Sequence, residues 1–249
     1  MGRVDLFFDC NSKKLLRREA ICELMDNRLG FDHLVISRAK SQLAESEVAL
    51  SEPIGELAET LRGRSQPGRP SDVERLIGAA IIQTLLERNV PVDAVMHGTF
   101  DDKADLVAGP KTVDDIWNVI PFENYIVTAQ LSPEEIRIVM EEVFASHEKR
   151  NLIGFEVKTE GRGGDCKIAS MALANREPLD RNKKYVIAFN SFDARSGGHH
   201  FMKLRTFLGG PEANCVLHPV QTRDALIGYF QRHKIVHRIA AVNALAVAA

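Results

Sequence analysis

Apolar and polar residues follow two different periodicities along this chain, and together they predict alternating strands and helices. The clearest strand is predicted over residues 125–131, where β-branched residues are bounded by turn-forming residues. Helices are predicted to begin after Ser71 and Ser132, because each serine precedes a glutamate by three residues and is followed by apolar residues at helical spacing. A shorter helix is predicted after Thr112. This alternation favours the α/β (or mixed α+β) class, with a mixed sheet flanked by helices.

Weaker patterns complete the predicted domain. Four more strands are expected, at residues 91–96, 153–158, 166–172 and 184–189. A last helix is expected from Thr222, and residues 97–111 and 190–201 are expected to be polar loops that contain glycine. The Gly161–Gly164 segment lies between two predicted strands rather than between a strand and a helix, so a hairpin turn is favoured over a phosphate-binding loop.

The ends of the chain differ from its middle. Residues 1–25 predict two short strands, and a lone hairpin is marginally stable in water, so this one is expected to pack on something outside the chain. Residues 26–52 are charged and weakly periodic, as in a helical connector. We therefore divide the chain into residues 1–52, a main domain at 53–236, and an Ala/Val-rich tail at 237–249 that is expected to fray.

Composition narrows the function classes. The chain has 249 residues, 45% hydrophobic and 27% charged, which is ordinary for a soluble globular protein. Its formal net charge of -2 makes it a poor binder of nucleic acid or anionic membranes. No apolar run is long enough for a transmembrane helix, and the apolar stretch Leu6–Phe8 is too short for a signal-peptide core. The four cysteines are scattered, as expected for free thiols.

Two phenylalanines are candidates for ligand binding. Phe122 comes just before the main predicted strand and Phe192 just after another, and ligands meet open α/β sheets at strand ends. Two such rings could hold a planar base between them, although phenylalanine is more often a core residue. A metal on His199 and His200 is disfavoured, because adjacent side chains point apart and lack a third ligand at a suitable spacing.

Several segments, taken in order, carry a family resemblance. They are residues 54–55, 71–77, 108–116, 119–127, 131–136, 190–198 and 222–230. Together they resemble the C-terminal domain of the 5'-nucleotidase family, exported metallophosphatases that include UDP-sugar hydrolases. Residues 1–25 are similar to the last strands of that family's N-terminal metallophosphoesterase domain. We therefore expect this chain to be a fragment, or to come from a gene that has lost the region encoding the N-terminal domain.

The resemblance implies a substrate-binding role. Family members stack a base between two phenylalanines in this domain, which correspond to Phe122 and Phe192, and Asn124 is expected to hydrogen-bond the ring edge. Lys103 stands where the family has an arginine, and His199 where it has a ribose-binding aspartate. Weaker candidates for phosphate or sugar contacts are Lys103, Arg75 and His199.

The resemblance places catalysis elsewhere. Family members hold two divalent metals on Asp, His and Asn side chains of the N-terminal domain, and this chain has neither an Asp-x-His nor a Gly-Asn-His motif. We therefore predict no catalytic residue, metal or cofactor in this chain, and expect the metal pair on a missing N-terminal domain.

Three functional hypotheses follow. The leading one is a nucleoside- or nucleotide-binding domain that serves a metallophosphoesterase partner in nucleotide hydrolysis. The alternative is a non-catalytic interaction or dimerisation module that kept the fold and lost nucleotide binding, with a homodimer among its assemblies. The third, a phosphatase with its own metal on His199 and His200, is disfavoured for want of ligand spacing. The family is usually periplasmic or extracellular, and the sequence leaves localisation open.

Overall fold

The computed structural model describes the whole chain except residues 27, 100–103, 147, 162–164 and 243–249. The chain divides into two compact units, Met1–Val48 and Ala49–Ala249, which are described separately. Among the helices of the described residues, none is both long and apolar enough to cross a membrane.

The first unit is a hairpin followed by a helix. Strands β1 (Gly2–Phe8) and β2 (Leu15–Cys22) pair in antiparallel fashion, and helix α1 runs over His33–Leu50. The two strands and the helical connector were all predicted from the sequence. Every residue of β2 is exposed and α1 buries none of its residues, so this unit has no hydrophobic core of its own among the described residues.

The second unit is built on a five-stranded mixed sheet with the order β11-β6-β10-β4-β7. Strands β10 and β4 are parallel, and the other neighbouring pairs are antiparallel. The strands are β4 (Ala94–His97), β6 (Tyr125–Leu131), β7 (Asn151–Ile153), β10 (Tyr185–Asn190) and β11 (Val216–Gln221). Strand β6 has the bounds predicted from the sequence.

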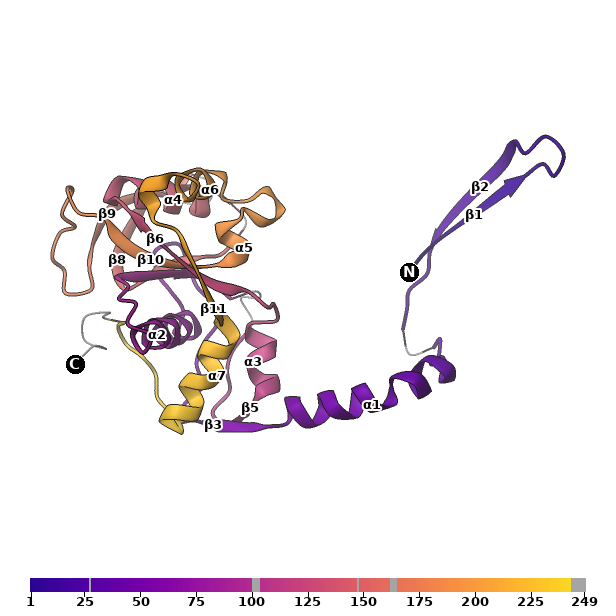
Figure 1. Cartoon of the computed structure of the whole chain (residues 1–249), viewed down its shortest axis with the longest axis horizontal. Helices are drawn as coiled ribbons and strands as arrows, with labels where there is room; N and C mark the ends of the chain where they lie inside the picture. The colour runs from indigo at the N-terminus through magenta and orange to yellow at the C-terminus, as the bar shows by residue number, and fades with distance from the viewer. Residues whose placement is uncertain (27, 100–103, 147, 162–164, 243–249) are drawn as a thin grey trace. The chain divides into compact units, whose positions relative to one another are not determined.

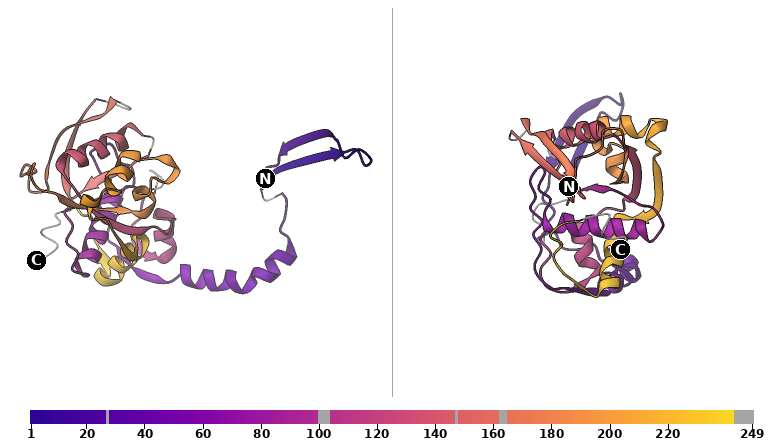
Figure 2. Two further views of the ribbon diagram at one scale, coloured as in Figure 1. Left: turned by 45° about the horizontal axis from the view of Figure 1, so that its top comes forward. Right: turned by 90° about the vertical axis from the view of Figure 1, so that its left-hand side faces the viewer.

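Helices cover both faces of this sheet (Figures 1 and 2). One face carries α2 (Asp72–Leu86), α3 (Val113–Val119) and α7 (Thr222–His233). The other carries α4 (Pro133–Ala145), α6 (Met202–Leu208) and the short α5 (Ser191–Ala194). Each face has its own cluster of buried apolar side chains, so the sheet is packed on both sides, as the α/β prediction requires.

The two predicted capping boxes are present. The Ser71 hydroxyl accepts from the Glu74 backbone N–H at 3.1 Å, and the Glu74 carboxylate accepts from the Ser71 N–H at 2.7 Å. Ser132 and Glu135 make the same pair of bonds at 3.3 and 2.7 Å. These bonds satisfy N–H groups that a helix start leaves open, which is why the sequence located α2 and α4 closely.

The structure also corrects parts of the sequence prediction. The predicted loop 97–111 ends in a strand, β5 (Gly109–Thr112), which joins β3 (Pro53–Leu57) and β12 (Ile235–Val236) in a small second sheet. The predicted loop 190–201 contains α5. Within the predicted tail, Val242 is 6% exposed and belongs to the core, residues 237, 238, 240 and 241 are exposed, and residues 243–249 lie outside the described residues.

One predicted strand, 153–158, is two strands. Gly154 has φ +109°, and a β-carbon there would lie 2.8 Å from the Asp93 carbonyl oxygen, so the chain turns where only glycine fits. Before the turn lies β7 of the main sheet. After the turn, β8 (Phe155–Glu160) pairs in antiparallel fashion with β9 (Lys167–Leu173). This pairing agrees with the hairpin predicted around residues 161–164. Residues 162–164 themselves lie outside the described residues.

Candidate functional site

Three predicted site residues meet at one edge of the main sheet. Strands β6 and β10 are antiparallel neighbours, with Ile126 opposite Asn190, so the start of β6 lies beside the end of β10. Phe122 and Asn124 come just before β6, and Phe192 comes just after β10. The sheet topology therefore brings together side chains that are 70 residues apart in sequence.

A cavity of about 210 Å³, which we call the ring cavity, lies at this edge. Phe122 and Phe192 line it, with exposed fractions of 51% and 46%. Pockets for drug-sized molecules usually have roughly 300–1,000 Å³, so this cavity fits a single ring system. The rest of its lining is His97, Gly98, Val119, Ile120, Pro121, Asn124, Glu148, Arg150 and Asn190.

The turn that carries Phe192 is held by its own cap. The Asn190 side chain accepts from the Asp193 backbone N–H at 2.8 Å and donates to the Asp193 carboxylate at 2.6 Å. The Ser191 hydroxyl accepts from the Tyr125 N–H at 3.1 Å, which ties α5 to the start of β6. The cap accordingly fixes the backbone on both sides of Phe192.

The Phe192 ring lies over Gly197. A β-carbon at position 197 would overlap three atoms of that ring, so only glycine allows the ring to take this position. The φ of Gly197 is not in the left-handed region, and the requirement for glycine is one of space.

A buried ion pair anchors the same turn. The Arg150 guanidinium donates to the Asp193 carboxylate through Nε at 2.8 Å and through Nη2 at 3.3 Å. The Arg150 side chain is 12% exposed and that of Asp193 is 1% exposed. Charge-assisted, two-point contacts of this kind are strong and directional, so Arg150 holds α5 against the segment before β7.

Burial and these charges set the protonation of the site. Burial lowers the pKa of His97 to about 4, and the positive charge of Arg150 acts in the same direction, so His97 is neutral near pH 7. Burial alone would lower the pKa of Arg150, but Asp193 and Glu148 outweigh burial and raise it. The site therefore contains one permanent cation beside a neutral imidazole.

Glu148 supplies a carboxylate at the rim. Its side chain is 37% exposed, with Oε2 3.4 Å from Arg150 Nη2 and Oε1 4.0 Å from His200 Nε2. The described part of the ring cavity thus combines two aromatic walls, an amide, a neutral imidazole and a carboxylate–guanidinium pair. Such a mixture suits a planar, polar-edged ring.

Comparison with known proteins identifies the family to which this chain belongs. The family model described as the 5'-nucleotidase C-terminal domain matches residues 53–206, which is more than half of the chain. The chain belongs to the 5'-nucleotidase C-terminal domain family. The ring cavity lies within the matched region, as do Phe122, Asn124 and Phe192.

Individual proteins agree with this assignment of the fold. The chain is similar to a 5'-nucleotidase precursor from Thermus thermophilus, with a TM-score of 0.67, 19% identity, and coverage of 96% of this chain and 48% of that one. It is similar to the NAD nucleotidase from Haemophilus influenzae, with a TM-score of 0.62, 16% identity, and coverage of 96% and 47%. It is also 22% identical over 245 residues to endonuclease YhcR from Bacillus subtilis (strain 168), covering 94% of this chain.

The chain is shorter than all three of these proteins. It spans about half the length of the two solved chains and 19% of the Bacillus endonuclease. The two solved structures are less than 25% identical in sequence to this chain. Their similarity shows that the chain has the fold of a 5'-nucleotidase C-terminal domain.

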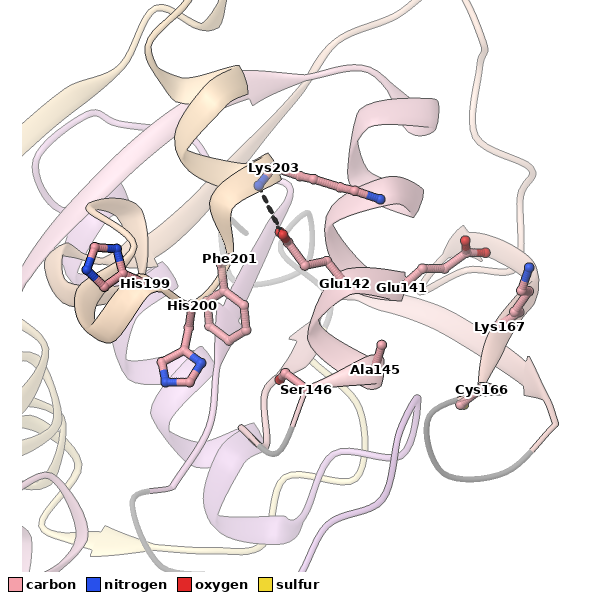
Figure 3. Close-up of a pocket in the computed structure, with 10 residues that line it drawn as sticks. All are labelled: Glu141, Glu142, Ala145, Ser146, Cys166, Lys167, His199, His200, Phe201 and Lys203. Atoms are coloured by element: carbon pink, nitrogen blue, oxygen red, sulfur yellow. Dashed lines mark hydrogen bonds between the residues drawn. The ribbon is translucent and has the colours of Figure 1, made fainter.

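Two other predicted site residues, Arg75 and His199, do not line the ring cavity of this 5'-nucleotidase C-terminal domain. Arg75, on α2, lines a separate cavity and pairs with Asp72 at 3.4 Å. His199 lines another pocket, of about 490 Å³, together with Glu142. Figure 3 shows His199 on the far side of that pocket from Cys166. The Glu142 carboxylate accepts a hydrogen bond from the Lys203 backbone N–H at 3.1 Å. Lys103 lies outside the described residues.

Four residues of the site were not predicted from the sequence: His97, Glu148, Arg150 and Asp193. Arg150 and Asp193 are 43 positions apart, and no local pattern joins them. Asp193 had a usable signal, because Asn190 precedes it by three residues in a capping arrangement. Glu148 and Arg150 follow α4 in a charged segment without periodicity, so nothing in the sequence distinguished them from solvated charges.

A metal site is not found in the described part of this domain. No group of three or more His, Cys, Asp or Glu side chains there is arranged to hold a metal ion. The four cysteines, all within the described residues, are free, with Cys166 buried and the other three exposed.

Proposed function

We propose that this 5'-nucleotidase C-terminal domain binds a nucleoside or nucleotide through its base, held between Phe122 and Phe192, and presents it to a metallophosphoesterase domain for hydrolysis. Asn124 would hydrogen-bond the edge of the base. The phosphate would lie outside the ring cavity, toward the partner domain that carries the metals.

The observation that carries this proposal is the ring cavity itself. Two phenylalanines, one in the segment before β6 and one in the short helix α5, line one cavity of single-ring size, and each is about half exposed. A side chain that served only the core would be buried, as Phe189 and Phe230 are. Aromatic rings stacked on a base contribute roughly 1–3 kcal/mol per base.

The proposed partner domain is supported by the first unit. In β1 all residues but Asp5 are exposed, and in β2 all are, including large apolar side chains such as Phe8 and Leu16. Exposed apolar residues on both faces of a hairpin indicate a surface that another body covers. The two solved relatives are about twice as long as the part that this chain matches, which leaves room for such a body in them.

Removal of either stacking ring should weaken ligand binding. Phe122→Ala and Phe192→Ala are each expected to reduce the affinity for adenosine by roughly 1–3 kcal/mol, the contribution of one stacked aromatic. Because both rings are half exposed, each variant should lose only about 1 kcal/mol of unfolding free energy. Isothermal titration and urea denaturation measure the two quantities separately.

The control is Phe31→Ala, since Phe31 is 81% exposed and lies in the first unit. It should leave adenosine affinity unchanged. A folded wild-type chain that binds no nucleoside would contradict the proposal and favour the interaction module. Loss of the fold in the Phe122 and Phe192 variants, without a change in affinity, would assign these residues to the core.

A substitution at Gly197 should act on binding through Phe192. Gly197→Ala places a β-carbon where the Phe192 ring lies, and the ring, which is half exposed, can turn away. Adenosine affinity is then expected to fall by about 1 kcal/mol or more, the weaker end of one stack. Combined with Phe192→Ala, the same substitution should have little further effect on affinity, which titration of the double variant checks.

A further inference from the structure

The only cation that lines the ring cavity among the described residues, Arg150, is already engaged. Its Nε and Nη2 donate to Asp193, and its Nη1 donates to the Lys149 carbonyl at 2.9 Å. Nη2 also lies 3.4 Å from the Glu148 carboxylate. A guanidinium whose nitrogens are all directed at protein acceptors has little capacity left for a ligand phosphate.

Among the described residues, the charged group formed by Arg150 and its two carboxylate partners is net negative. The Arg150 guanidinium pairs with two carboxylates, Glu148 at the rim of the cavity and Asp193, which is not among the lining residues, and these three groups sum to a formal charge of -1. His97, on β4, adds no charge near pH 7, because burial lowers its pKa to about 4. An anionic group placed beside the Glu148 carboxylate would meet repulsion, whereas an N–H donor would meet attraction.

Glu148 is the acceptor best placed for such a donor. Asp193 is 1% exposed and is occupied by Arg150 and Asn190, whereas the Glu148 side chain is 37% exposed at the rim. An ionised carboxylate has about four acceptor positions and no donor, and the 3.4 Å contact with Arg150 accounts for one of them. The Arg150 contact also limits the directions that the carboxylate takes.

We infer that Glu148 determines the specificity of the ring cavity, accepting a hydrogen bond from an amino group on the edge of the bound base. The domain then selects nucleosides whose base carries an exocyclic amine over the same ring without one, and it leaves the phosphate outside. This inference rests on the proposed function and deepens it by naming the class of base.

Titration of the full chain with adenosine and with purine riboside, which is adenosine without its amino group, tests the inference. Both ligands offer nearly the same stacking area, so their ratio isolates the amino group. We expect the wild type to bind adenosine about tenfold more tightly, the size of a hydrogen bond to a charged acceptor. Glu148→Ala should abolish the preference for adenosine. Glu148→Gln keeps a neutral acceptor, so this variant should bind adenosine about threefold more tightly than purine riboside.

The control is Glu177→Ala, which removes an exposed carboxylate from the turn after β9 and should keep the preference. Equal wild-type affinity for the two nucleosides, with Phe122→Ala weakening both, would overturn the inference and leave the proposed function standing. A preference that persists in Glu148→Ala would also overturn it, by assigning the amino group to another acceptor. If neither nucleoside binds the folded wild type, the proposed function and the inference fail together.

Discussion

Replacing Arg150 by methionine is expected to lower the free energy of unfolding by about 3–5 kcal/mol, the usual cost of leaving one partner of a buried ion pair alone. The substitution leaves the Asp193 carboxylate 1% exposed and without its guanidinium, with the Asn190 amide and its own backbone cap as remaining neighbours. The loss should be large because methionine fills similar space but donates no hydrogen bond. Urea denaturation of the purified chain measures it.

A surface pair provides the matched control. Arg137 and Glu134 approach to 2.7 Å, close to the 2.8 Å of Arg150 and Asp193, but their side chains are 45% and 62% exposed. Arg137→Met should therefore cost about 1 kcal/mol or less, since exposed pairs are solvated in either state. If Arg150→Met proved equally mild, the pair would not anchor α5. The double variant Arg150→Met with Asp193→Asn should lose less unfolding free energy than the two single variants lose in sum.

The elements that the sequence located well are those fixed by local chemistry. Strand β6 and helices α2 and α4 were predicted because their signals, β-branched runs and capping boxes, act within a few residues. Strands β5 and β3 were missed because each is short and includes a proline, and they exist through pairing with each other across the chain. The break at Gly154 was missed because its cause is the carbonyl of Asp93, on a distant segment.

The candidate site divides in the same way. Phe122 and Phe192 could be chosen from their positions at the ends of predicted strands, and Asn124 from the family resemblance. That they share a cavity depends on β6 and β10 being neighbours, which is a property of strand order. Arg75 and His199, suggested by resemblance alone, line two other cavities.

The residues that were missed show what local patterns omit. Arg150 meets Asp193 over 43 positions, and the burial of His97 follows from the strands on either side of β4. The sequence therefore identified Phe122, Phe192 and Asn124, whereas His97 and the charged residues of the site became evident only in the three-dimensional structure.

The protonation of His97 makes stability depend on pH in a definite direction. An unfolded histidine takes up a proton below about pH 6.5, whereas His97 in the fold does so only near its pKa of about 4. Acid therefore favours the unfolded state: the contribution is complete above about pH 6.5 and is lost as the pH falls to about 4. The difference between these two pKa values corresponds to about 3 kcal/mol.

Glu74 acts in the opposite sense, since burial raises its pKa and the fold holds that proton more tightly than the unfolded chain. Comparison with His97→Gln separates the two effects. Between about pH 7.5 and about pH 4.5, the wild type should lose about 2–3 kcal/mol more unfolding free energy than this variant does. His237→Gln, at an exposed histidine, is the control and should follow the wild type. Identical pH dependence in wild type and His97→Gln would show that the fold does not lower the pKa of His97.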